Sequence, residues 1–140
     1  MADIDHEIKI KAPQAEVFTA LTTIKGLKAW HTSRVDGKAD AGGVIAMHTE
    51  PKFEWRVTKA DKPHRVEWKC VKGPGNSVGT TARFDLSTTP DGRTFVELSH
   101  AGWIDTAGNY RKCNTRWGIL LHHLRKHAES GKTDPVFTSP

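Results

Sequence analysis

The sequence predicts an α+β fold in which an antiparallel sheet packs against one long C-terminal helix. Between residues 33 and 100, short segments alternate apolar and polar side chains, a pattern typical of strands with one buried face. Over residues 110–129 the apolar residues instead recur at steps of three and four, as on one face of an α-helix. A helix of about 20 residues is about 30 Å long, enough to cross a small sheet.

The N-terminal segment predicts one strand followed by two short helices. Residues 4–11 alternate isoleucine or histidine with charged side chains, which indicates a half-buried strand. Pro13 suits the first position of a helix, where its missing N–H is not needed. We therefore expect one helix over residues 13–22 and a second helical segment over 24–29.

The central part of the chain predicts a meander of strands separated by turns. Proline, glycine and aspartate mark these turns, most clearly at Pro63 and at Pro90-Asp91-Gly92. The outward positions mix acidic and basic residues that can pair across strands, so we interpret this face as solvated and not as a binding site. The strands are expected over residues 33–37, 43–49, 53–58, 65–70, 81–86 and 96–100.

The end of the chain predicts a capped helix and a tail. Gly131 suits a left-handed cap after residues 110–129, and basic residues in the last turns face the negative end of the helix dipole. Residues 133–140 have no periodicity, which favours a flexible tail. The expected organisation is one domain over residues 1–132 followed by that tail.

Composition restricts the class of partner. The chain has 140 residues and a formal net charge of +5, but no run of like charges, so nucleic-acid binding is not favoured. No apolar run approaches the ~20 residues that a membrane-spanning helix needs, and the N-terminus lacks the apolar region of a secretory leader. With Cys70 and Cys113 as its two cysteines, we expect a cytoplasmic protein without disulfides.

Several segments resemble, in order, the helix-grip fold of the START-like superfamily, also called the SRPBCC or Bet v 1-like superfamily. Within it, the sequence is most similar to the subfamily of activator of Hsp90 ATPase homologues. The resemblance covers nearly residues 3–130. The segments that carry it are Ile10-Lys11-Ala12-Pro13, Gly42-Gly43, Pro63-His64-Arg65-Val66-Glu67-Trp68, Leu98-Ser99-His100-Ala101-Gly102-Trp103, and Trp117 with Leu120, Leu121 and Leu124.

This resemblance implies a curved sheet of about six or seven strands around the C-terminal helix, with a cavity between them. Members of the superfamily bind lipids, hormones, polyketides and other apolar molecules in that cavity, and some are cyclases, aromatases or hydrolases. The eukaryotic co-chaperone has a separate N-terminal Hsp90-binding domain, for which we expect no room in 140 residues.

The candidate ligand-binding residues are aromatic, apolar or histidine side chains expected to face inward or to lie near the cavity mouth. Aromatic walls with a few polar groups are typical of small-molecule pockets, but the same residues can also fill a solid core. His100 either contacts a ligand or bonds to a nearby backbone carbonyl. The set is Trp30, His31, His48, Trp55, Trp68, Phe84, Leu98, His100, Trp117 and Leu121.

Three functions follow from this set. The first is binding of a small hydrophobic or aromatic molecule, and the second is cyclase- or hydrolase-type catalysis by His100 with His31 or His48. The third is a chaperone-associated role with a protein partner such as Hsp90, and a homodimer is compatible with each. No cofactor motif is present, and the histidines are too scattered to predict a metal site.

Overall fold

A computed structural model describes residues 2–138, so Met1 of the predicted domain and residues 139–140 of the predicted tail lie outside the described part. The predicted α+β helix-grip fold is confirmed, with a long C-terminal helix and two short helices after the first strand. In chain order, the elements are β1 (Ala2–Ile10), α1 (Gln14–Thr22), α2 (Ile24–Trp30), β2 (Val35–Gly37), β3 (Val44–Met47), β4 (Phe53–Asp61), β5 (Arg65–Lys72), the 3-10 turn η1 (Gly75–Ser77), β6 (Thr81–Thr88), β7 (Thr94–Trp103) and α3 (Asn109–Ser130).

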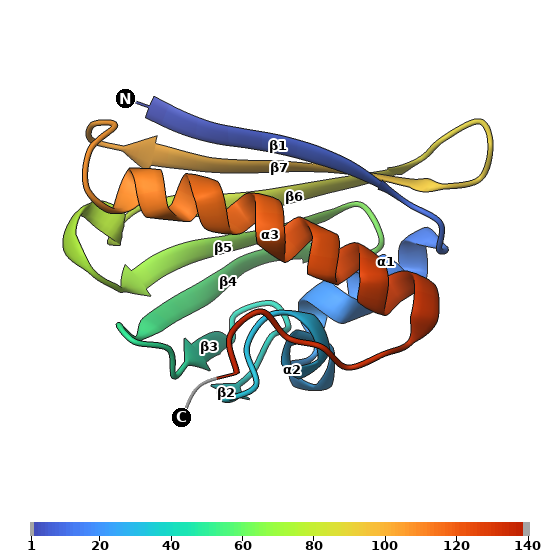
Figure 1. Ribbon diagram of the computed structural model, residues 1–140, viewed down its shortest axis with the longest axis horizontal. Coiled ribbons are helices and arrows are strands. Elements are labelled where there is room, and N and C mark those ends of the chain that lie inside the picture. Colours follow the sequence, from blue (N-terminus) through green and yellow to red (C-terminus); the bar gives the residue numbers. More distant parts are fainter. Residues whose placement is uncertain (1, 139–140) are drawn as a thin grey trace.

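The seven strands form one antiparallel sheet in the order β1-β7-β6-β5-β4-β3-β2. Strands β2 to β7 follow one another as a meander, and β1 pairs with β7 at the far edge (Figure 1). Register places the small residue Ala82 between Trp68 on β5 and His100 on β7. These residues share the face that packs toward α3, because residues directly opposite one another in an antiparallel pair point to the same side.

Helix α3 lies across the inner face of the sheet, while α1 and α2 cover one end of it (Figure 1). Its apolar face is buried as the spacing predicts, and Gly131 ends the helix in the left-handed conformation with φ of 74°. The backbone N–H of Gly131 donates to the carbonyl of His127 over 2.7 Å, a bond typical of a glycine cap. Within residues 2–138, no helix is both long and apolar enough to cross a bilayer.

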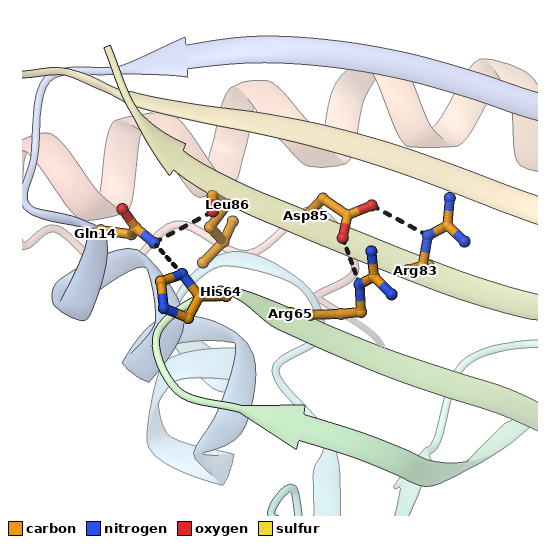
Figure 2. Close-up of polar contacts among 6 residues, drawn as sticks. All are labelled: Gln14, His64, Arg65, Arg83, Asp85 and Leu86. Carbon is orange, nitrogen blue, oxygen red and sulfur yellow. Dashed lines mark hydrogen bonds and ion pairs between the residues drawn. The ribbon is translucent and has the colours of Figure 1, made fainter. Parts of the chain in front are cut away.

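The outer face of the sheet carries paired charges, in line with the sequence. Figure 2 shows Asp85 on β6 between two arginines, with Arg65 Nε at 2.5 Å and Arg83 Nε at 3.1 Å from its carboxylate oxygens. The hydrogen bond to Asp85 is the main reason that the pKa of Arg65 is raised. Only the Arg65–Asp85 pair joins two strands, because Arg83 and Asp85 both lie on β6. All three side chains are partly exposed, so the pairs contribute little to stability.

Gln14 fastens the first helix to the sheet at the other end of the same view. Its Nε2 donates to the carbonyl of Leu86 on β6 over 3.2 Å (Figure 2). The same nitrogen donates to the carbonyl of Pro63 in the β4–β5 turn over 2.8 Å. Pro13 is the N-cap and not the first helical residue as predicted, with ψ of 146°. Its carbonyl still accepts the first helical bonds of α1.

Residues 134–137 of the predicted tail are hydrogen bonded along the end of α2 and the residues after it. The last carbonyls of a helix lack partners within it, and the tail supplies donors to them. An ion pair of 2.8 Å between Lys126 and Asp134 also ties the tail to α3. The backbone bonds run from Asp134 to Ala29, from Val136 to Trp30, from Phe137 to His31 and from Ser33 to Phe137.

Truncating the core contact of α3 tests how far the fold depends on this helix. Leu124 is fully buried, whereas Ile119 on the opposite face is 46% exposed. We expect Leu124→Ala to lower the free energy of unfolding by about 2–5 kcal/mol, since it leaves a cavity. The matched variant Ile119→Ala should change it by no more than about 0.5 kcal/mol. Urea denaturation followed by tryptophan fluorescence measures both, and equal losses would contradict this view of α3.

Candidate functional site

A cavity of about 560 Å³ opens between α3, the β3–β4 region and the C-terminal segment. Figure 1 shows the C-terminal segment returning below α3 to the side of the molecule that holds β2 and β3. The volume lies within the range typical of small-molecule sites. Its wall is mainly apolar, formed by Met47, Phe53, Trp55, Cys113, Trp117, Leu120, Val136 and Phe137.

The structure brings half of the predicted site residues to this cavity. His31, His48, Trp55, His100 and Trp117 line it. The other predicted residues pack in the core beside it and do not line it, because alternation along a strand gives the face of a side chain but not its position along the sheet. These core residues are Trp30, Trp68, Phe84, Leu98 and Leu121.

Several lining residues were not predicted. Met47 and Phe53 follow the same period-two pattern as Trp55, so the sequence held a signal for them. Leu120 belongs to the apolar face of the predicted helix, whereas Arg116 was expected on its solvent-facing side and instead lines the cavity. The tail residues that form one wall gave no signal, because no periodicity marks residues 136–138.

Aromatic rings form the inner end of the cavity. Phe53 stacks on Trp55 with centroids 5.6 Å apart and planes 8° from parallel, and Trp55 lies 5.6 Å from the ring of His100. The Nε1 of Trp55 is buried without a hydrogen-bond partner among the described residues.

His100 is fully buried, and both of its nitrogens are hydrogen bonded. The indole of Trp117 donates to its Nδ1 over 2.9 Å, which makes Nδ1 the unprotonated nitrogen. Thr80 Oγ1 uses its one proton on the carbonyl of Ser77 over 2.6 Å. It must therefore accept from Nε2–H of His100, 2.8 Å away. This chain fixes a neutral tautomer, and burial lowers the pKa of His100 to about 4.

His31 is a second neutral histidine at the cavity. It is 5% exposed, and its Nδ1 lies 2.7 Å from Thr32 Oγ1. Its ring lies among those of Trp30, Trp117 and Phe137, at 5.1, 6.4 and 5.8 Å between centroids. Burial lowers the pKa of His31 to about 3, so at neutral pH it adds no charge to the cavity.

The charged groups gather at the mouth of the cavity. Arg34, Arg116 and Glu50 line it. His48 also lines it and places its Nε2 2.9 Å from a carboxylate oxygen of Asp36 on β2. The mouth is therefore polar and the inner end apolar, a division that suits a molecule with two unlike ends.

The cysteines and the acidic residues do not form a reactive or metal-binding centre. Burial raises the pKa of Cys113, which lines the cavity, to about 11, and that of Cys70 to about 12. Both thiols thus stay protonated at neutral pH, and the thiolate is the reactive form. Within residues 2–138, no group of three or more histidine, cysteine or acidic side chains is arranged to hold a metal ion.

A curved sheet closed by a long helix, with an apolar cavity between them, defines the class of helix-grip proteins. The chain belongs to the family of activator of Hsp90 ATPase homolog 1-like proteins, whose sequence profile matches residues 11–129. The predicted family is therefore confirmed. No curated protein sequence matches the chain.

Solved structures agree with this assignment. The chain is 34% identical to the Aha1 protein of Colwellia psychrerythraea, solved in solution as a dimer, with a TM-score of 0.86 over 94% of this chain and 99% of that one. CalU16 of Micromonospora echinospora is 21% identical, with a TM-score of 0.74 over 92% of this chain and 77% of that one. DynU16, from the dynemicin biosynthetic locus, is 16% identical, with a TM-score of 0.76 over 94% of this chain and 48% of that one. The last two show a shared fold.

The two buried histidines predict a loss of stability in mild acid. Their pKa values are about 3 and 4 in the folded protein, below the ordinary value of about 6.5 expected after unfolding. Only the unfolded chain gains protons as the pH falls from 6.5 toward 4, so the stability present above pH 6.5 is lost in that window. We expect the free energy of unfolding to fall by up to about 1.4 kcal/mol per pH unit for each histidine.

Urea titrations between pH 6.5 and 4.5 measure this slope. His100→Gln removes one of the two buried titrating groups and should make the slope shallower. His122→Gln, at an exposed position on α3, should leave it unchanged. An identical slope in the wild type and in His100→Gln would refute the assignment of His100 as a buried neutral group.

Proposed function

We propose that the protein binds a small hydrophobic or aromatic molecule in the cavity between the sheet and α3. The observation that carries this proposal is a mainly apolar cavity of about 560 Å³ beside the hydrophobic core. Water gains few hydrogen bonds from such walls, whereas an apolar guest removes their surface from water at roughly 25 cal/mol per Å².

The walls are held in place without a guest, which supports binding. Trp117 is fixed by its hydrogen bond to His100, and Phe53 is stacked on Trp55. The C-terminal wall is fixed by the bonds of residues 134–137 to the end of α2. A guest therefore loses little free energy to the ordering of side chains.

Filling the cavity should abolish binding. Leu120 lines the cavity from α3, whereas its neighbour Ile119 faces outward. We expect Leu120→Trp to weaken binding of the neutral dye N-phenyl-1-naphthylamine at least about tenfold, because the added indole occupies the guest volume. Ile119→Trp adds the same indole outside the cavity and should bind the dye normally. Dye fluorescence measures both, and native mass spectrometry of protein from its own host tests for a bound small molecule.

A catalytic role for His100 with His31 or His48 has less support. General acid–base catalysis needs a group that exchanges protons near neutral pH and reaches the substrate. Both nitrogens of His100 are already engaged, and burial holds the pKa of His100 and that of His31 at about 4 and 3. His48 is the only one of these three histidines that is partly exposed, and it pairs with Asp36 at the mouth.

A chaperone-associated role is the second candidate, supported by the 34% identity to the Aha1 dimer of Colwellia psychrerythraea. Val78 and Ile104 are 55% and 77% exposed, on two loops that Asn76 joins through bonds to Asp105 and the carbonyl of Ala107. Exposed apolar side chains on such a fixed surface suit a protein partner. We propose this end of the sheet as the contact for Hsp90 or for a second copy in a homodimer, in a cytoplasmic setting consistent with two free cysteines.

A charge introduced at this surface should weaken the contact with a protein partner without affecting the cavity. We expect Ile104→Glu to remove any stimulation of Hsp90 ATP hydrolysis and to shift the protein toward monomer, because an ionised side chain is costly to bury in an interface. Thr106→Glu, two residues further along the same exposed loop, is the matched control. ATPase assays and sedimentation equilibrium measure the two effects. Wild-type protein that is monomeric and leaves the ATPase rate unchanged would eliminate this candidate.

A further inference from the structure

We propose that the guest of the cavity is an organic anion, with a flat apolar body and one anionic group that Arg116 receives at the mouth. This inference rests on the proposed ligand-binding function and specifies its ligand class. It follows from the placement of Arg116, from the charges around it and from the shape of the apolar walls.

Arg116 interrupts the side of α3 that faces the cavity. Cys113, Trp117 and Leu120 line the cavity together with it, at spacings of three and four residues along one helix face. A charged residue on an apolar helix face loses part of its hydration, so its position needs a compensating contact. The guanidinium of Arg116 has one such contact, with its Cζ 5.7 Å from the centre of the Phe137 ring.

A carboxylate partner is missing from this arrangement. Arg65, Arg83 and Arg93 each pair with an aspartate. Arg116 is half-buried, yet no carboxylate among residues 2–138 forms an ion pair or hydrogen bond with it. The ring of Phe137 attracts the cation but accepts none of its five N–H donors in plane, so these donors are available to a ligand carboxylate or sulfonate.

The other charged lining groups favour a single negative charge on the ligand. Arg34 adds a second cation to the lining. Asp36 already accompanies His48, with its carboxylate 2.9 Å from Nε2. Glu50 lies exposed on the β3–β4 loop, where water screens its charge but where it still opposes a highly charged ligand. Two arginines and the carboxylates of Asp36 and Glu50 therefore lie at or beside the mouth, so a ligand with several negative charges is not favoured there.

The inner end of the cavity selects the body of the ligand. Phe53 and Trp55 are parallel, and the ring of Trp117 lies on the α3 side. Ring edges and faces pack best against another flat ring system. Inorganic anions would leave these walls without contacts, so the class we infer is an aromatic monoanion.

Two dyes with the same naphthylamine body separate the contribution of the negative charge from that of the apolar body. N-phenyl-1-naphthylamine is neutral, and 1-anilinonaphthalene-8-sulfonate adds one negative charge to that body. At pH 8, we expect the wild-type protein to bind the sulfonate at least about tenfold more tightly, in line with hydrogen bonds to a charged group. Arg116→Met keeps an unbranched apolar stem and should remove this preference, so that the two dyes bind with about equal affinity. Glu50→Gln should increase affinity for the sulfonate about twofold or more.

The control is Arg111→Met, which removes a positive charge from an exposed position on the same helix. It should retain the preference for the sulfonate. A variant with Arg116→Gln repeats the test with a different neutral side chain. The ratio of the two dye affinities, measured in each variant, separates the loss of the charge from a change in the shape of the cavity.

The outcomes are distinct. If neither dye binds to the wild-type protein, the proposed function fails and this inference fails with it. If the neutral dye binds and the sulfonate binds no more tightly, the cavity binds ligands but the anion assignment is overturned. Equal losses of sulfonate binding in Arg111→Met and Arg116→Met would also overturn it. The net charge of the protein, and not a contact with Arg116, would then explain why the sulfonate binds more tightly.

Discussion

The hydrogen bond from Trp117 to His100 sets the boundary between the packed core and the cavity. It joins α3 to β7 over 2.9 Å in a place where neither group is exposed to solvent. Because Thr80 and Ser77 complete the chain of donors and acceptors, the histidine stays neutral and its ring cannot turn. On one side of this bond the side chains interlock, and on the other they leave the open volume.

Small residues and register make this arrangement possible. Ala82 lies between Trp68 and His100 in neighbouring strands, so two large rings fit on one face of a closely spaced sheet. Larger side chains at that position would force the rings apart. The cavity lies between α3 and the sheet and is closed on one side by β3, the β3–β4 loop and the C-terminal segment.

The sequence indicated the family and most of the architecture, but only part of the candidate site. Trp55 and Trp117 were predicted as ligand-binding residues and line the cavity, whereas Trp68 and Phe84 were predicted with the same reasoning and lie in the core. A period of two or 3.6 gives the side of an element that is buried. The period does not show whether that buried side faces other side chains or an open cavity.

Local chemistry along the chain determined the elements: alternation made the strands, the three-and-four spacing made α3, and Gly131 ended it. Tertiary structure alone decided where the cavity lies, that Arg116 borders it, and that residues 134–137 close one side by bonding to the end of α2. The physical reason is that secondary structure follows from interactions between near neighbours in sequence. A cavity is a relation between surfaces that are distant in the chain, and its volume depends on how all of them pack at once.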